Sequence, residues 1–85
     1  MPERYVLYQY ESCGFCHRVR QFLAEAGIEM EMRDTLRDPE ARRELMEGGG
    51  RSTVPCLRIE RDGEVRWLYE SRDIIDYLRR QYANA

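Results

Sequence analysis

The stretch that decides the fold is residues 4–26, RYVLYQYESCGFCHRVRQFLAEA, where a strand pattern passes directly into a helix pattern. Residues 4–10 are rich in Tyr, Val and Leu, which is typical of a buried strand. In residues 16–26 the apolar side chains recur at the spacing of an amphipathic helix, at Val19, Phe22, Leu23 and Ala26. The motif Cys13-Gly14-Phe15-Cys16 therefore lies where the strand ends and the helix begins.

The middle of the chain predicts a second strand and a second helix. In residues 28–33 the apolar residues Ile28, Met30 and Met32 alternate with charged ones, the period of a strand with one wet face. Asp38-Pro39 predicts a helix start, because Asp caps helices and Pro fits the first helical position. We expect the buried stripe of this helix at Ala41, Leu45 and Met46, and its end at Gly48-Gly49-Gly50.

The last third predicts a hairpin and a final helix. Residues 56–60 and 64–69 flank the turn signal Arg61-Asp62-Gly63. The final helix, with Ser71 as its expected cap, would bury Ile74, Ile75, Leu78 and Tyr82. This order predicts an α/β protein of thioredoxin-like fold: a four-stranded mixed sheet flanked by three helices (β-α-β-α-β-β-α), its first two strands parallel and joined by a right-handed crossover.

Size and charge limit the classes of function. Residues 1–85 are expected to form a single domain, and a net charge of -2 gives no electrostatic case for nucleic acid. No run approaches the roughly 20 apolar residues of a membrane span, and the N-terminus has no signal-peptide core. We therefore expect a cytoplasmic protein with no membrane partner. Three cysteines, an odd number, argue against a disulfide framework.

The cysteine motif predicts thiol–disulfide chemistry. Disulfide exchange needs a thiolate, and the unpaired N–H groups at a helix N-terminus stabilise an anion there. Cys13 is the expected nucleophile, and Cys16, one turn further on and more buried, is the expected resolving thiol. A structural zinc site and an inert pair of core cysteines are the alternatives. The remaining zinc-ligand candidates are only His17 and Cys56, and Gly14 at the helix start predicts exposure of the motif.

Two further segments predict parts of a binding site. Thr53-Val54-Pro55 precedes a strand, and a cis Pro55 would leave the Val54 backbone free to pair with an extended peptide. Glu70-Ser71 opens the last helix, where Ser71 and helix amides can bind a carboxylate and Glu70 an ammonium group. A trans proline on an edge strand and a plain helix cap are the structural alternatives.

These segments together resemble the glutaredoxin family. Residues 10–18 are similar to the glutaredoxin active-site segment, whose usual motif is CPYC, and residues 49–55 are similar to its segment ending in TVP. The pair Gly14-Phe15 resembles instead the monothiol branch, with motif CGFS, whose members often bind a [2Fe-2S] cluster between two subunits. Residues 69–75 resemble the glutathione-binding turn of glutathione transferase N-terminal domains.

The resemblance implies a glutathione-dependent oxidoreductase that reduces protein disulfides and glutathionylated proteins, with Cys13 and Cys16 as its redox-active pair. It implies that glutathione, the co-substrate, contacts Tyr10, Phe15, Arg51, Val54, Pro55, Glu70 and Ser71. Tyr10 stands where the family often has lysine. The alternatives are a [2Fe-2S] carrier that uses Cys13 and dimerises with its cluster, a glutathione transferase, and a thioredoxin-like donor that ignores glutathione. A monomer is expected unless a cluster binds.

Overall fold

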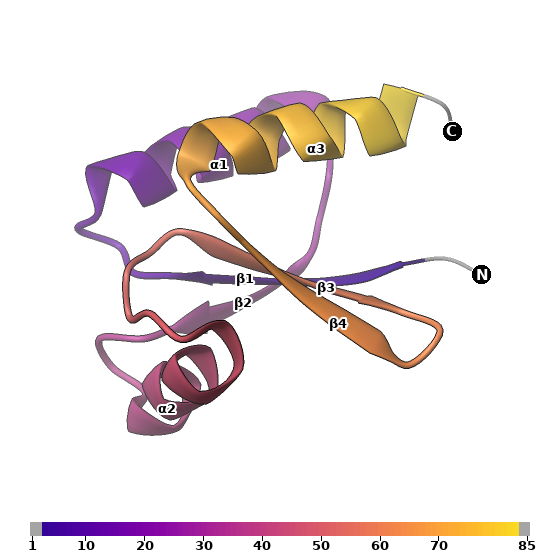
Figure 1. The fold of residues 1–85 in the computed structure, drawn as a ribbon. Helices are drawn as coiled ribbons and strands as arrows, with labels where there is room; N and C mark the ends of the chain where they lie inside the picture. Colours follow the sequence, from indigo (N-terminus) through magenta and orange to yellow (C-terminus); the bar gives the residue numbers. More distant parts are fainter. Residues whose placement is uncertain (1–2, 84–85) are drawn as a thin grey trace.

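The computed structural model describes residues 3–83 (Figure 1). Strands and helices alternate as the sequence predicts, and the final hairpin precedes the last helix. The elements are β1 (Arg4–Gln9), α1 (Gly14–Ala26), β2 (Glu31–Asp34), α2 (Pro39–Gly49), β3 (Cys56–Arg61), β4 (Glu64–Tyr69) and α3 (Ser71–Ala83). No helix in this described part is long and apolar enough to span a membrane.

The strands form one mixed sheet in the order β2-β1-β3-β4. β1 pairs parallel with β2 and antiparallel with β3, which pairs antiparallel with β4. Asp62 and Gly63 both have positive φ, 52° and 82°, as the tight turn between β3 and β4 requires. The predicted thioredoxin-like fold is confirmed.

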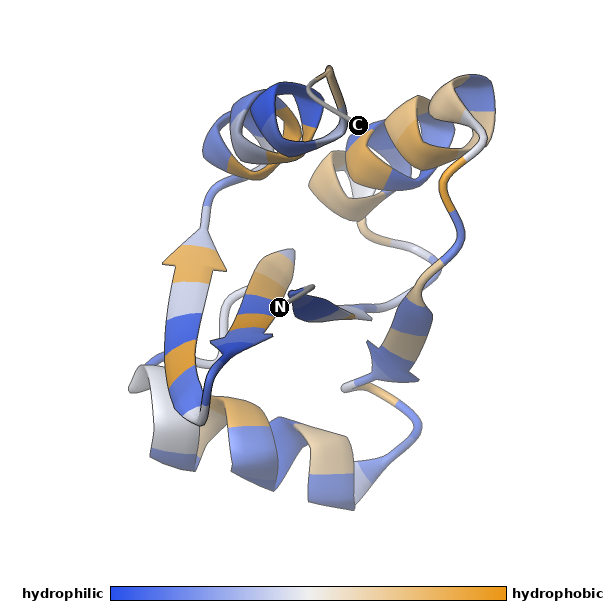
Figure 2. Cartoon of the chain, turned by 90° about the vertical axis from the view of Figure 1, so that its right-hand side faces the viewer, coloured by the Kyte–Doolittle hydropathy of each residue, from blue (hydrophilic) through white to orange (hydrophobic). Residues whose placement is uncertain are grey.

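The sheet separates two apolar layers. α1 and α3 cover one face and α2 covers the other (Figure 1), while apolar and polar bands alternate along the elements (Figure 2). The larger core lies under α1 and α3 and is formed by Leu7, Val19, Leu23, Ile28, Leu57, Ile59, Ile74, Tyr77 and Leu78. The smaller core lies under α2 and is formed by Val6, Tyr8, Ala41, Leu45 and Cys56.

Several element details differ from the sequence prediction. β2 begins only at Glu31, so Ile28 joins the core from the preceding loop, and Met32 lies exposed on the edge strand. Met46 and Tyr82 are also exposed, because each lies at the margin of its helix stripe. Ser71 is the first residue of α3 and not its cap: the Ile74 N–H donates to the Glu70 carbonyl (3.0 Å).

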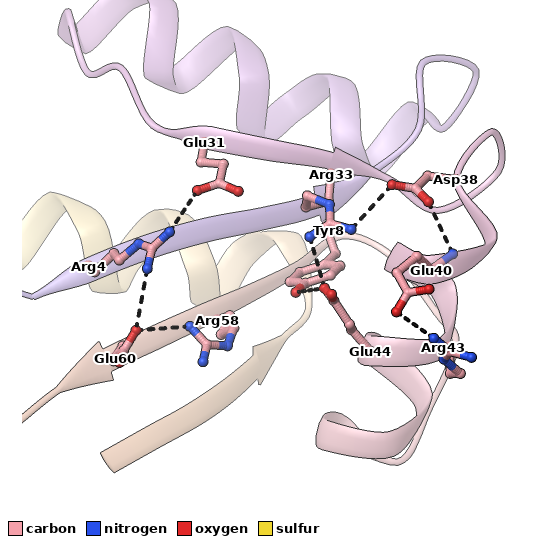
Figure 3. A network of polar contacts seen from close by, with 10 residues as sticks. All are labelled: Arg4, Tyr8, Glu31, Arg33, Asp38, Glu40, Arg43, Glu44, Arg58 and Glu60. Atoms are coloured by element: carbon pink, nitrogen blue, oxygen red, sulfur yellow. Dashed lines mark hydrogen bonds and ion pairs between the residues drawn. The ribbon is translucent and has the colours of Figure 1, made fainter. Parts of the chain in front are cut away.

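A network of ion pairs covers the sheet beside α2 (Figure 3). The Tyr8 hydroxyl donates to Glu44 (2.8 Å), and Arg33 bridges Glu44 (3.0 Å) and Asp38 (3.2 Å). Arg4 pairs with Glu31 across the strands (3.1 Å). The hollow among these side chains has a volume of about 560 Å³, and most of the charges that line it form ion pairs with one another or with Glu60. We therefore assign it a structural role.

Candidate active site

Cys13 lies at the N-cap of α1, where the β1–α1 loop ends. Its backbone is extended (φ -84°, ψ 120°), and its sulfur accepts a hydrogen bond from the Cys16 N–H (3.2 Å). The sulfur thus occupies the position of a capping oxygen, facing unpaired amides and the positive end of the helix dipole. Cys13 is partly exposed, and nothing lies within 4 Å of a side-chain position on Gly14. The local sequence therefore places an accessible sulfur where an anion is stabilised.

Cys16 is fully buried beneath Cys13, at 0% exposure. Burial raises the pKa of the Cys16 thiol to about 12, and its hydrogen bond with Cys13 adds to the effect. Cys16 therefore holds its proton while Cys13 is free. The two cysteines have unequal surroundings, as the sequence predicted from their positions on the helix.

Arg20 stabilises the loop that carries Cys13 through hydrogen bonds. Its guanidinium donates to the carbonyl oxygens of Tyr10 (3.2 Å) and Glu11 (3.1 Å), and also to the Gln9 side chain. The Tyr10 carbonyl in turn accepts from the Cys13 N–H (3.3 Å). Arg20 comes from the second turn of α1, so the helix holds its own entry loop. The sequence analysis did not identify this residue, because two of its three partners are backbone carbonyls about ten positions away.

The segment before β3 lies against Cys13. The Val54–Pro55 peptide bond is cis, as the motif predicted. The Cys13 thiol donates to the Val54 carbonyl (3.8 Å), across 41 positions of sequence. Within residues 3–83, the Val54 N–H has no hydrogen-bond partner. An edge with one free N–H next to the reactive sulfur is available to pair with an extended peptide.

A pocket of about 410 Å³ near Cys13 is lined by residues from the starts of α1 and α3 and from the segment before β3. The starts of the two helices lie at the same end of the molecule (Figure 1). Six of the seven residues predicted to bind glutathione line it: Phe15, Arg51, Val54, Pro55, Glu70 and Ser71. Phe15 forms an exposed apolar wall, at 60% exposure. The seventh, Tyr10, lies in a separate pocket.

Glu70 has a backbone conformation that side-chain-bearing residues rarely adopt. Its φ is +74°, in the left-handed region, which costs about 1–2 kcal/mol for a residue other than glycine. This turn connects β4 to α3 and directs Glu70 into the pocket lining, next to the buried Ser71. A conformational cost at such a position is typical of a functional site.

Tyr69 anchors Arg51, a role that the sequence analysis did not identify. The Tyr69 hydroxyl donates to the Arg51 carbonyl (2.8 Å) and accepts from the Arg51 N–H (3.3 Å). The Arg51 guanidinium lies 4.1 Å from the centre of the Tyr69 ring. A side chain at Gly49 would overlap the same hydroxyl, so the glycine is required for this contact. The pair joins the end of β4 to the segment before β3.

Arg42 is the third residue that the sequence analysis missed, because the charged run around it is typical of a solvated helix face. It lines a pocket of about 400 Å³ together with Tyr10 and Ser52. Tyr10 and Ser52 flank the segments that carry Cys13 and Val54. A cation therefore lines the pocket that holds Tyr10, which is separate from the pocket that holds Glu70.

All three cysteines are free thiols, and within residues 3–83 no three His, Cys, Asp or Glu side chains gather as a metal site. Cys56 is fully buried under Pro55. Burial raises the pKa of the Cys56 thiol to about 12, although a hydrogen bond with Tyr69 and the charge of Arg51 act in the opposite direction. Cys56 is therefore a packing residue of the smaller core.

The sheet, its helices and the Cys13–Cys16 pair at the start of α1 define a protein of the thioredoxin-like fold with a CxxC motif at the start of its first helix. The glutaredoxin family model matches residues 5–65, and the chain belongs to the glutaredoxin family.

Three proteins that are similar to this chain are each longer than the part that matches it. The Gene 56 protein of Mycobacterium phage D29 is 35% identical over 51 residues, which are 60% of this chain and 57% of that protein. Glutathione transferase Omega 1C from Trametes versicolor has 26% identity and a TM-score of 0.78, over 98% of this chain and 39% of its own. Maleylacetoacetate isomerase from Anaeromyxobacter dehalogenans 2CP-1, solved with bound GSH, has 30% identity and a TM-score of 0.70, over 93% of this chain and 38% of its own.

Proposed function

We propose that this protein is a glutathione-dependent oxidoreductase that reduces protein disulfides and glutathione mixed disulfides. The observation that carries the proposal is the Cys13 sulfur, which accepts from a helix amide at 3.2 Å beside a pocket that offers charges of both signs. A thiolate so placed is a nucleophile for disulfide sulfur. Membership of the glutaredoxin family supports the same chemistry.

The lining of the site suits the charge pattern of glutathione. Its γ-glutamyl end carries an ammonium and a carboxylate, which Glu70 on one side and Ser71, the α3 amides and Arg51 on the other can pair. The cysteinyl backbone can pair with Val54, which brings its sulfur to Cys13. The glycyl carboxylate then reaches toward Arg42 and Tyr10 in the neighbouring pocket.

The reaction proceeds by thiol–disulfide exchange. The Cys13 thiolate attacks the glutathione sulfur of a mixed disulfide, forms a Cys13–glutathione disulfide, and releases the protein thiolate, which takes a proton from water. A second glutathione thiolate then attacks the bound glutathione sulfur, which yields glutathione disulfide and restores the Cys13 thiolate. With a protein disulfide, Cys16 attacks Cys13 instead, and two glutathiones later reduce the Cys13–Cys16 disulfide.

The test is reduction of a glutathionylated peptide, coupled to glutathione reductase and NADPH, with and without glutathione. Turnover that requires glutathione is expected. Reduction supported equally by thioredoxin reductase without glutathione would contradict the proposal and favour a thioredoxin-like donor. Conjugation of an electrophile to glutathione, with no disulfide reduction, would favour a transferase. We also propose that the protein acts as a monomer in the cytoplasm, where free thiols persist.

A [2Fe-2S] carrier is the second candidate. The open space over Gly14 favours it, because a second subunit and its cluster could approach the Cys13 sulfur there. Cys13 is the one partly exposed thiol among residues 3–83, so each subunit could offer one cysteine ligand to the cluster. The sulfur of glutathione would have to supply the other ligand on each side. Anaerobic reconstitution with iron, sulfide and glutathione tests this candidate. Visible absorbance together with a dimer would support the carrier function, and a colourless monomer would reject it.

Replacing Glu70 by Gly is expected to stabilise the fold and weaken glutathione use. Glycine removes the cost of the left-handed backbone conformation, about 1–2 kcal/mol, but it also gives the unfolded chain more conformational entropy. The net gain in the free energy of unfolding is about 0.5–1 kcal/mol. That gain corresponds to a melting temperature about 2–8 °C higher. Loss of the charged partner should raise the KM for glutathione about tenfold or more.

The matched control is Asp62→Gly, which removes an acidic residue of positive φ from the β3–β4 turn, far from Cys13. It should shift the melting temperature in the same direction and leave the KM for glutathione unchanged. An unchanged KM in Glu70→Gly would remove Glu70 from the proposed site.

Replacing Tyr69 by Phe should impair glutathione binding through Arg51. The ring and its contact with the guanidinium remain, but both hydrogen bonds to the Arg51 backbone are lost. At about 1 kcal/mol, this loss predicts a KM for glutathione about fivefold higher, with kcat nearly unchanged. Tyr8→Phe, which removes the hydroxyl bonded to Glu44, is the control and should leave this KM alone. Equal effects in both variants would assign Tyr69 a purely structural role.

A further inference from the structure

The pocket beside Cys13 carries more positive charge than glutathione needs. Three arginines line it, Arg18, Arg51 and Arg72, against a single acidic residue, Glu70. The whole chain has a net charge of -2. The excess of cations is therefore a local feature of the active-site end.

Several arginines outside this pocket form ion pairs with carboxylates. Arg4, Arg43 and Arg61 pair with acidic neighbours, as do Arg33, Arg58 and Arg79. Arg18 and Arg72 are both exposed, and neither forms an ion pair with any residue in the described range 3–83. Arg18 lies over the Phe15 ring, 5.7 Å from its centre. Their charges are thus available to a partner.

Glutathione itself leaves these two arginines unused in the proposed binding mode. Glu70 takes its ammonium group, Arg51 and the α3 N-terminus take one carboxylate, and Arg42 takes the other. Arg18 lies in the second turn of α1 and Arg72 in the first turn of α3, and both line the pocket. In a glutathionylated protein, they are therefore available to the chain that is attached to the glutathione sulfur.

We propose that Arg18 and Arg72 select glutathionylated proteins whose modified cysteine is flanked by acidic residues. The inference rests on the proposed function and names its substrate class. Each exposed charge pair contributes little binding energy. Two arginines that face two acidic residues of the substrate also accelerate the encounter of the two proteins at low salt. We expect kcat/KM for an acidic-flanked substrate to exceed that for a basic-flanked one by about threefold to tenfold.

The test uses two glutathionylated peptides that differ only in the residues flanking cysteine, Glu in one and Lys in the other. The readout is the ratio of their kcat/KM values in the glutathione-coupled assay. The ratio should fall to about one in Arg18→Gln/Arg72→Gln and invert in Arg18→Glu/Arg72→Glu. It should stay at the wild-type value in Arg43→Gln/Arg61→Gln, which removes the same charge from paired positions.

Salt provides a second readout. Raising the ionic strength from about 0.01 M to about 1 M shortens the screening length from about 30 Å to about 3 Å, so the wild-type ratio should approach one. A ratio of one at low salt, or a ratio unchanged in both Arg18/Arg72 variants, would overturn the inference while leaving the proposed function intact. Absence of glutathione-dependent turnover of either peptide would overturn both.

Discussion

Cys13→Ser is expected to abolish reduction of glutathionylated peptides, with kcat/KM lowered on the order of 1,000-fold or more. The α1 amide and helix dipole that face the Cys13 sulfur favour a thiolate. A serine hydroxyl in the same place keeps its proton near neutral pH and forms no disulfide. The hydroxyl can still cap α1, so the variant should fold.

The measurement is the glutathione-coupled assay, with the melting temperature as the check on folding. Cys56→Ala is the control, because it removes a thiol close to the site that is buried and bonded to Tyr69. It should cost some stability and keep its activity. Equal turnover in wild type and Cys13→Ser would refute the assignment of Cys13 as nucleophile.

Cys16→Ser is expected to separate the two proposed reactions. Glutathione can resolve a Cys13–glutathione disulfide from solution, so reduction of glutathionylated peptides should continue. A mixed disulfide between Cys13 and a protein substrate is resolved from within the molecule by Cys16. Replacing that neighbouring thiol by glutathione in solution should slow protein disulfide reduction at least about 100-fold, because the attack becomes intermolecular.

The structure also explains why Cys16 acts second. Burial and its bond to Cys13 raise the pKa of Cys16 to about 12 in the reduced protein. Once Cys13 is in a disulfide, it no longer carries the charge that opposes ionisation of Cys16, and attack becomes easier. Mass spectrometry of Cys16→Ser mixed with a disulfide substrate should detect a lasting Cys13 adduct. A wild-type rate on protein disulfides would show that Cys16 is not the resolving thiol.

The sequence alone determined the order of elements and the reactive end of the first helix. Strand and helix periods, the Asp38-Pro39 start and the Asp62-Gly63 turn depend on neighbours a few positions apart, so local preferences fix them. The same holds for Cys13, whose place at a helix start follows from the residues around it. Where the prediction was wrong, as for Met32, Met46 and the Ser71 cap, the error lay at the edge of an element, where local preference is weakest.

Only the tertiary structure decided which residues complete the site. Val54 meets the Cys13 sulfur across 41 positions, and Tyr69 holds Arg51 across 18. Arg18 and Arg72 come from two helices and line one pocket, while Arg42 lines another. The fold brings the starts of α1, α3 and β3 to one end of the molecule (Figure 1). An exposed arginine has no local preference that distinguishes a solvated helix face from a pocket wall. Packing of the helices on the sheet, which depends on the whole core at once, makes that distinction.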